Sequence, residues 1–328
     1  MRDVLCVVRS SPGGVTVDQK TSTITLPLDE KLSAKAIRVG LGGGGANAAV
    51  AAARLGLRVG LVSGIGRDDV GMQVEQALKQ EGVDTAFLSR VSLEQTGISL
   101  SLLDESSGQQ SSLYAGGANR FLDLTEDVQK TFHTTGWIYV TSFGEAREEN
   151  LGILAEALGQ ENTHLALAPG AGDLRNGRSF FSRIFPQTDI LILNEGELPA
   201  FWGEEGMTAE DAAVRLIADG VRIVAITRGG QGAALYTAED SFSVPAVASS
   251  VLDTTGAGDA FGATLVASLS KEPDDLERAI GRAAINAGSV VSTHTAQTGL
   301  LTESVLEDKM RRSPVKVRKQ QRGSGDAT

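Results

Sequence analysis

One short segment combines an anion-binding turn with a carboxylate that is able to accept a proton. Residues 253 to 261 have the sequence Asp-Thr-Thr-Gly-Ala-Gly-Asp-Ala-Phe and lead into an apolar stretch that predicts a buried helix over residues 260 to 269. The first backbone N–H groups of a helix have no partner within it, and the small residues before this helix would let a phosphate approach them: Gly256, Ala257 and Gly258. Asp259 would then stand beside the anion and accept the proton of an attacking hydroxyl. An ordinary helix N-terminus has a similar composition, because Asp is a common cap and Gly a common turn residue.

This nonapeptide closely resembles the carboxyl-terminal signature of the ribokinase-like (PfkB-type) carbohydrate kinases, Asp-Thr-x-Gly-Ala-Gly-Asp-x-Phe. Four further motifs of that family have counterparts in the same order, within residues 3 to about 300. They are LGGGGANAA at residues 41–49, VSGIGRDDVG at 62–71, NEGE at 194–197 and TRGGQG at 227–232. The chain is therefore identified as a member of this family by resemblance, which implies an ATP-dependent kinase.

The resemblance also implies a nucleotide and metal site. In the family, the Asn and Glu that match Asn194 and Glu197 help to place Mg²⁺ and its waters near the phosphates. A helix cap followed by a first-turn acid has the same appearance. By the same resemblance, the nucleotide is bordered by Thr227, Gly229, Gly232 and, on the adenine side, Asn286; Asp253 and the Thr255 carbonyl are candidates for a monovalent cation such as K⁺.

On the substrate side, the resemblance makes Gly42 and Gly43 a floor for a sugar, with Asn47 and Asn119 contacting its hydroxyls. Asn47 would otherwise be only a helix cap. Relatives commonly carry a substrate-binding Asp shortly after the first strand. Here that strand runs into Arg9 to Gly14, with Gly13 or Gly14 near the expected position, and Asp18 would substitute only in a longer loop. Ribokinases proper also tend to have Lys where this chain has Gly44. The substrate therefore stays open among sugars, sugar acids and nucleosides.

The glycine-rich run at residues 40 to 45 also satisfies the dinucleotide pattern G-x-G-x-x-G, follows the strand-like residues 36 to 39 and opens an Ala-rich helix. With five glycines in six residues the match is nearly automatic. The next strand-like run, residues 59 to 62, ends in Ser-Gly and offers no acidic residue to a ribose. A catalytically silent sugar or nucleotide sensor is thus the alternative to the kinase, and a nicotinamide-dependent oxidoreductase is less favoured than either.

Composition excludes several classes of partner. The chain has 328 residues with 41% hydrophobic content, 30 Lys and Arg against 41 Asp and Glu, and a formal charge of −11. This charge disfavours nucleic acid and anionic membrane surfaces. A single cysteine, Cys6, excludes an intrachain disulfide framework. No apolar run reaches the length of about 20 residues that spans a bilayer, so we expect a cytoplasmic protein.

Apolar runs of strand length alternate with helix-length segments and predict an α/β fold. The expected fold is ribokinase-like and doubly wound, with a mostly parallel sheet flanked by helices. The expected strands include residues 4–8, 59–62, 137–140, 164–168, 190–193 and 223–226. Residues 15 to 41 and 96 to 115 break the pattern and predict a small β-sheet lid, or else two exposed hairpins. In the resembling family, such a lid can also pair two subunits into a homodimer. The kinase domain should span 1–312, followed by a disordered basic tail at 313–328.

Overall fold

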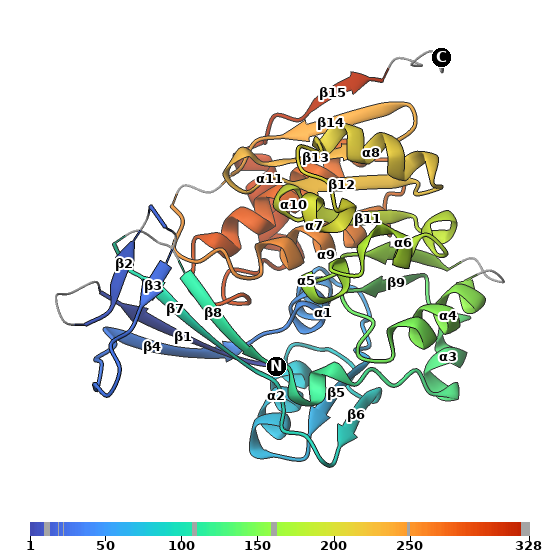
Figure 1. Cartoon of the computed structure of the whole chain (residues 1–328). Helices are drawn as coiled ribbons and strands as arrows, with labels where there is room; N and C mark the ends of the chain where they lie inside the picture. Colours follow the sequence, from blue (N-terminus) through green and yellow to red (C-terminus); the bar gives the residue numbers. More distant parts are fainter. Residues whose placement is uncertain are drawn as a thin grey trace.

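The computed structural model describes residues 1–9, 14–18, 20–21, 23–106, 110–158, 163–247 and 250–322. Its centre is a seven-stranded sheet with the order β15-β14-β13-β12-β11-β10-β9 (Figure 1). Four strands are parallel to one another, and the remaining three continue the sheet antiparallel. The parallel strands are β9 (Trp137–Val140), β10 (His164–Leu167), β11 (Ile190–Asn194) and β12 (Ile223–Thr227); the antiparallel strands are β13 (Ala233–Tyr236), β14 (Asp240–Val244) and β15 (Arg318–Gln321).

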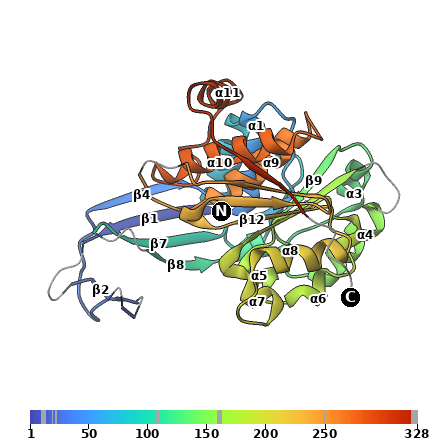
Figure 2. The ribbon, with the colours of Figure 1, turned by 90° about the horizontal axis from the view of Figure 1, so that it is seen from above.

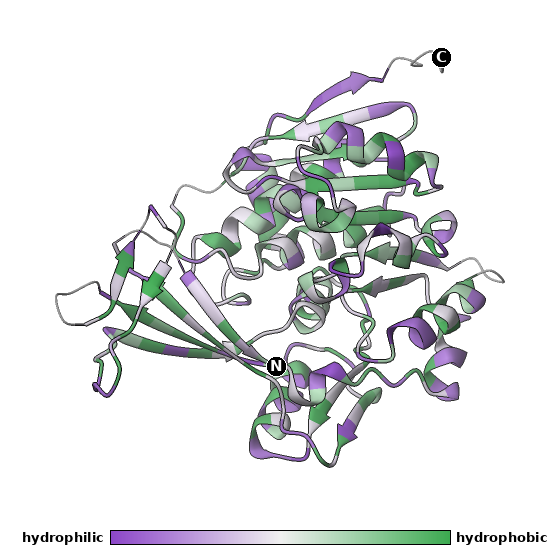
Figure 3. Ribbon diagram, in the orientation of Figure 1, coloured by the Kyte–Doolittle hydropathy of each residue, from purple (hydrophilic) through white to green (hydrophobic). Residues whose placement is uncertain are grey.

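Helices cover both faces of this sheet, as Figure 2 shows from above. One face carries α1 (Gly44–Arg54), α9 (Ala257–Leu269), α10 (Leu276–Val291) and α11 (Glu303–Arg312). The other carries α3 (Glu126–Phe132), α4 (Arg147–Leu158), α5 (Ala171–Leu174), α6 (Gly177–Phe181), α7 (Leu198–Trp202) and α8 (Ala209–Ala218). Because both faces are covered, the inner strands are continuous apolar runs, visible as green strands in Figure 3.

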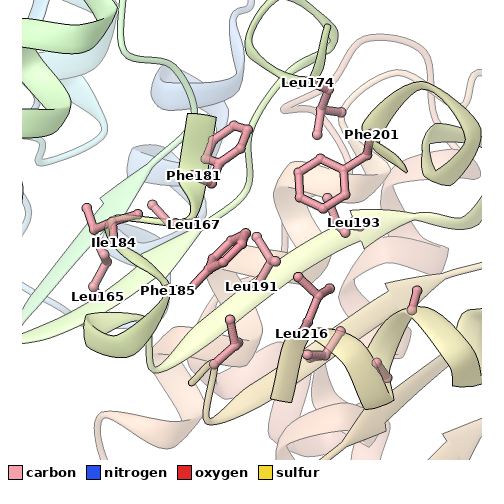
Figure 4. Close-up of a cluster of buried hydrophobic side chains, with 14 of the residues drawn as sticks. Leu165, Leu167, Leu174, Phe181, Ile184, Phe185, Leu191, Leu193, Phe201 and Leu216 are labelled. Carbon is pink, nitrogen blue, oxygen red and sulfur yellow. The ribbon is translucent and has the colours of Figure 1, made fainter. Parts of the chain in front are cut away.

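The largest apolar cluster lies between the sheet and the second helix layer (Figure 4). Leu191 and Leu193 project from β11 into it, and Phe181, Phe185 and Phe201 pack around them, each no more than 1% exposed. Each buried side chain of this size contributes about 1.5–3 kcal/mol to the free energy of unfolding. The cluster fixes the strand ends at which the functional side chains lie. The predicted α/β fold is confirmed.

A second, four-stranded sheet projects from the body and forms the predicted lid (Figures 1 and 2). Its order is β4 (Ala36–Leu41), β1 (Arg2–Val8), β7 (Ile98–Asp104) and β8 (Gln110–Ala115), and a short hairpin of β2 (Thr16–Asp18) and β3 (Thr23–Thr25) lies beside it. Residues 4–8 were predicted as a strand of the main sheet, and this prediction was wrong: β1 pairs antiparallel with β4 and parallel with β7. Because β4 is an antiparallel lid strand, the run at 40 to 45 is not the turn of a parallel dinucleotide-binding unit.

Another predicted strand is displaced along the chain. Residues 59–62 form only an isolated bridge, between Gly60 and Asp84. The strand begins later, as β5 (Ser63–Gly66), and pairs only with β6 (Leu88–Val91), after α2 (Asp69–Gln80). The first 3-10 helix, η1 (Gly117–Arg120), packs against β5, and η2 (Phe185–Gln187), η3 (Glu195–Glu197) and η4 (Gly229–Gln231) follow at strand ends. The main sheet therefore ends at β9.

The basic segment expected to be disordered is partly ordered. Residues 318 to 321 form β15, which pairs antiparallel with β14, and Lys319 lies 2.7 Å from the Asp240 carboxylate. This pair of opposite charges across the two strands stabilises the exposed edge strand despite its polar composition. Residues 323–328 lie outside the described part of the chain. Within that part, no helix is long and apolar enough to cross a membrane.

Candidate active site

The amino end of α9 presents free donors to solvent. Gly256 caps the helix with φ +79°, and a Cβ there would lie 2.5 Å from the Ala296 Cβ, so glycine is required on both conformational and steric grounds. The Gly256 carbonyl accepts the N–H of Ala260 at 2.9 Å, whereas the N–H groups of Gly258 and Asp259 have no acceptor among the described residues. Gly258 is exposed, and a Cβ there would meet nothing within 4 Å. The geometry suits an anion.

Asp259 stands on the first turn of α9, beside these donors. Its Oδ2 accepts the Nδ2–H of Asn47 at 2.8 Å, and Asn47 Oδ1 in turn accepts the Nε2–H of Gln297 at 2.9 Å. Burial raises the pKa of the Asp259 carboxyl, and the Asn47 hydrogen bond opposes that rise. The carboxylate is thus held in one orientation and is a stronger base than an exposed Asp. Asn47, which was predicted to contact the substrate, is buried, and its amide links the Asp259 carboxylate to Gln297.

Tyr139, at the floor of the site, was not predicted. A Cβ at Gly262 of α9 would lie 2.2 Å from its hydroxyl, so this glycine allows the tyrosine to pack under the helix. The hydroxyl is buried and has no hydrogen-bond partner among the described residues. Burial raises its pKa, and the negative charge of Asp259 raises it further. The phenol therefore stays protonated.

Asp3, in the lid strand β1, is a second carboxylate that sequence reasoning missed. Its Oδ1 is buried and accepts no hydrogen bond from any described residue. Burial raises its pKa to about 6, the Met1 ammonium lowers it, and the charges of Asp259 and Asp253 raise it. Burial likewise lowers the pKa of the Met1 amine to about 6. The available signal was a lone acid within an apolar strand, whereas the resemblance placed the expected Asp after the end of that strand.

The two glycines predicted as a floor for the sugar are covered by Asp3 and Met1. A Cβ at Gly42 would lie 1.8 Å from the Asp3 carboxylate, and one at Gly43 would lie 3.3 Å from the Met1 Cβ. The Gly42 N–H also donates to the Met1 carbonyl at 3.1 Å. These glycines therefore let Asp3 approach. Gly44 is the one that faces the base, since a Cβ there would lie 3.2 Å from Asp259 Oδ1.

Asn194 and Glu197 form a capping box at the carboxyl end of β11. Glu197 Oε2 accepts the Asn194 N–H at 2.9 Å, and Asn194 Oδ1 accepts the Gly196 N–H at 2.9 Å. Asn194 Nδ2–H donates to Thr227 Oγ1 at 3.2 Å, which brings the two neighbouring strand ends together. Burial raises the pKa of Glu197. The described residues contain no cluster of three metal-ligating His, Cys, Asp or Glu side chains. This donor set still fits Mg²⁺, which keeps most of its waters and needs only one or two carboxylates.

The residues predicted to border the nucleotide differ in whether a ligand could contact them. Gly229 lies at an exposed turn with φ +51° and has open space around it. Gly232 is structural, because a Cβ there would lie 2.0 Å from the Val244 carbonyl oxygen. Asn286 is fully buried, donates to Thr264 Oγ1 and accepts the Leu301 N–H, so its predicted adenine contact was wrong.

Asp253 shapes the loop before α9. Its Oδ1 accepts the Thr255 N–H at 2.9 Å, and its Oδ2 accepts the Thr295 N–H at 3.3 Å. Thr255 Oγ1 accepts the Nε2–H of Gln110, a residue of the lid strand β8, at 3.0 Å. The lid thus touches the loop before α9 directly.

The other substrate-side predictions are divided between the lid base and its tip. Asn119 Oδ1 accepts the Gly97 N–H at 2.8 Å at the base of the lid, and the Gly97 carbonyl accepts the Arg2 N–H next to Asp3. Asp18 lies in the lid hairpin, where its carboxylate accepts the backbone N–H of Lys20. Residues 10–13 of the loop from Arg9 to Gly14 lie outside the described residues.

Comparisons with known proteins show the family to which this chain belongs. The model of the pfkB family carbohydrate kinases matches residues 14–303. The ribokinase of Haemophilus influenzae is 29% identical over 278 residues, which cover 83% of this chain and 87% of that protein. The structure of Arabidopsis thaliana ribokinase complexed with ribose and ATP matches with a TM-score of 0.74 at 24% identity, covering 94% of this chain and 95% of that one. A putative ribokinase II from E. coli, in complex with ATP and Mg²⁺, matches with a TM-score of 0.73 at 21% identity, covering 94% and 97%. The chain therefore belongs to the pfkB family of carbohydrate kinases, which transfer a phosphoryl group to an alcohol.

Proposed function

We propose that this chain transfers the γ-phosphoryl group of Mg-ATP to a hydroxyl of a small sugar or nucleoside, with Asp259 as the general base. One observation carries the proposal: two free N–H donors of α9 lie beside a carboxylate that Asn47 orients. A carboxylate next to an anion site is repulsive in the absence of a reaction. It is useful when a hydroxyl must lose its proton as the phosphoryl group arrives, a contribution of about 10² to 10⁴ in rate.

In the proposed mechanism, ATP and Mg²⁺ supply the phosphoryl group and neutralise its charge when bound. Asp259 takes the proton of the acceptor hydroxyl on Oδ1, because Oδ2 is occupied by Asn47. The N–H groups of Gly258 and Asp259 stabilise the negative charge that gathers on the transferred group. Asn194 and Glu197 would hold the metal through its waters, and Thr227 and Gly229 would border the nucleotide. The contact between Gln110 and Thr255 would let the lid exclude water.

Asp3 and Asn119 are the groups proposed to recognise the acceptor. The buried Asp3 Oδ1 lacks a donor, and a sugar hydroxyl would supply one. Asp3 and Asp259 are close enough for the charge of one to raise the pKa of the other. A further carboxylate on the substrate would be repelled by both, so we favour a neutral sugar or nucleoside over a sugar acid.

Two accessory properties follow from the same loop and lid. Asp253 and the Thr255 carbonyl are proposed to lie next to a monovalent cation, and activity in K⁺ compared with Na⁺ tests this. Pairing of two lids into a homodimer would cover Ile37, Leu113 and Tyr114, which are 64%, 68% and 63% exposed on lid strands. Sedimentation that gives a fully active monomer at micromolar concentration would exclude the dimer.

A catalytically silent sensor is the second candidate, because Met1 and Asp3 cover the glycines expected to meet the sugar. The deciding experiment measures Mg-ATP-dependent ADP release over a panel of pentoses, hexoses, sugar acids and nucleosides, for the native chain and for Asp259→Asn. Turnover that depends on substrate and disappears in the variant supports the kinase and gives its substrate class. Thermal shifts with sugar and ATP but no ADP release from any acceptor would support the sensor.

A further inference from the structure

Tyr139 places a buried hydroxyl beneath the helix that carries Asp259. The residue as a whole is only partly buried, but its Oη is buried and has no hydrogen-bond partner among the described residues. A buried polar group without a partner destabilises a fold, and phenylalanine would supply the same ring without that cost. Gly262 of α9 makes the room for this oxygen, since a Cβ there would lie 2.2 Å from Oη. Two residues are thus adapted to a hydroxyl that packing alone does not require.

The hydroxyl lies on the same side of the sheet as Asp259, close to it. Asp259 and Gly262 are three residues apart on α9, so they share one face of the helix. On the strand side, Tyr139 packs on the cluster formed by α1 and α9, and Thr141 lies against Gly44 of α1. A Cβ at Gly44 would lie 3.5 Å from the Thr141 Cβ and 3.2 Å from Asp259 Oδ1. Helix and strand therefore both bring Tyr139 next to the carboxylate.

The charge of Asp259 acts on this hydroxyl directly. Among the described residues, Asp259 is the only charged group that adds to burial in raising the pKa of the phenol. Two amides and three titratable groups lie around the same carboxylate or act on its neighbour in the lid: Asn47, Gln297, Asp3, Asp253 and the Met1 amine. The two amides are already bonded to each other, and one of them also to Asp259. The phenol is therefore the neutral donor that is still unused.

We propose that Tyr139 is a positioning residue for the base: its hydroxyl turns its proton toward Asp259 and stabilises the ionised carboxylate that accepts the proton of the substrate. The inference rests on the proposed function of Asp259 as general base. A hydroxyl proton rotates about its C–O bond, so the phenol can point its dipole at a negative charge while its ring stays packed. Asn47 holds Oδ2 from the other side. Together the two donors favour the charged form in a buried place and leave Oδ1 to the acceptor hydroxyl.

Urea unfolding of Tyr139→Phe from pH 4.5 to 9 tests the proposal without any measurement of activity. At the acid end Asp259 is neutral, and the variant should be more stable than the native chain because an unpaired buried hydroxyl has been removed. Without the hydroxyl, the pKa of Asp259 in the folded state should be higher by about half to one unit, so the variant loses more stability as the pH rises. Its advantage should therefore shrink toward pH 9. In the Asp259→Asn background the advantage should be the same at every pH, which separates this effect from the titration of Asp3.

The pH–rate profile is the second measurement. The acid limb of kcat/KM should move to higher pH by the same amount in Tyr139→Phe, and the rates should approach the native values well above it. Tyr236→Phe is the control, because the charges that act on the Tyr236 phenol do not include that of Asp259. An advantage that stays constant over the pH range, an unmoved limb, or a variant less stable than the native chain at pH 4.5 would overturn the proposal. A shrinking advantage in a chain without kinase activity would support the role of Tyr139 and overturn the proposed function instead.

Discussion

Replacing Asn47 by alanine should move the acid limb of the pH–rate profile to higher pH. Asp259 works as a base only when ionised, and burial already raises its pKa. The Asn47 N–H is the one group found to oppose that rise, through a 2.8 Å bond to Oδ2. A hydrogen bond to a charged group is worth about 1.5–3 kcal/mol, and one pKa unit corresponds to about 1.4 kcal/mol. The pH at the midpoint of the acid limb of kcat/KM should therefore rise by about one to two pH units.

The assay is ADP release at saturating Mg-ATP, with subsaturating acceptor, from pH 4.5 to 9. Gln297→Ala is the matched control, because Gln297 bonds Asn47 but not Asp259 and should move the limb less, in the same direction. At pH values well above the limb, both variants should recover much of the native rate. An unchanged limb in Asn47→Ala, with measurable turnover, would refute the role of Asn47 as the group that tunes Asp259.

Four further substitutions test neighbouring parts of the site. Asp259→Asn should lower kcat/KM by a factor of about 10² to 10⁴. The melting temperature at pH 8 should not fall, because a pKa raised in the folded state means that the ionised carboxylate destabilises the fold at that pH. A large loss of stability would contradict this. In urea unfolding, Asp3→Asn should have the same free energy of unfolding as the native chain at pH 4 and a value up to about 3 kcal/mol higher at pH 7. The reason is that the Asp3 pKa is raised to about 6, so the native chain loses stability as the pH rises through that value. Equal stability of the two proteins at both pH values would count against burial of the acid. Gly258→Ala should fold normally yet raise the KM for ATP, because its methyl group would enter the open anion site. Gly256→Ala should instead lower the free energy of unfolding by about 1–3 kcal/mol, because of its positive φ and its contact with Ala296. Calorimetry and ATP titration of the two variants distinguish these roles.

The sequence predicted those features that arise from residues close together in the chain. The continuous apolar run at 190–193 forms a strand wherever it is covered on both faces, and β11 is such a strand. The loop before α9 is similarly local, because Gly256 and Asp259 are three residues apart and the helix itself fixes their relation. Local propensity and spacing suffice for such features.

Features that depend on distant partners were not predictable in the same way. Asn286 lies on a helix at a position the resemblance associated with adenine, yet Thr264 and Leu301 take both ends of its amide in the core. Asp3 meets Gly42 because β1 and β4 pair across the lid, with Arg2 opposite Leu41. Strand pairing of this kind is set by packing over the whole molecule, and neither composition nor periodicity contains it.

The polar strand β15 and the apolar strand β9 show two ways in which local composition does not predict the position of a strand in the sheet. Residues 318–321 have few apolar anchors, but β14 was available as an edge and Asp240 as a counter-charge, so tertiary context made a strand from a sequence that favours disorder. Residues 137–140 were predicted correctly as a strand, and its two apolar faces pack on the clusters on either side of the sheet. Among the described strands, β9 pairs with β10 alone, and an apolar groove lies along its other edge. Composition therefore predicts whether the faces of a strand are covered, whereas its hydrogen-bonded neighbours within the sheet are set by packing over the whole molecule.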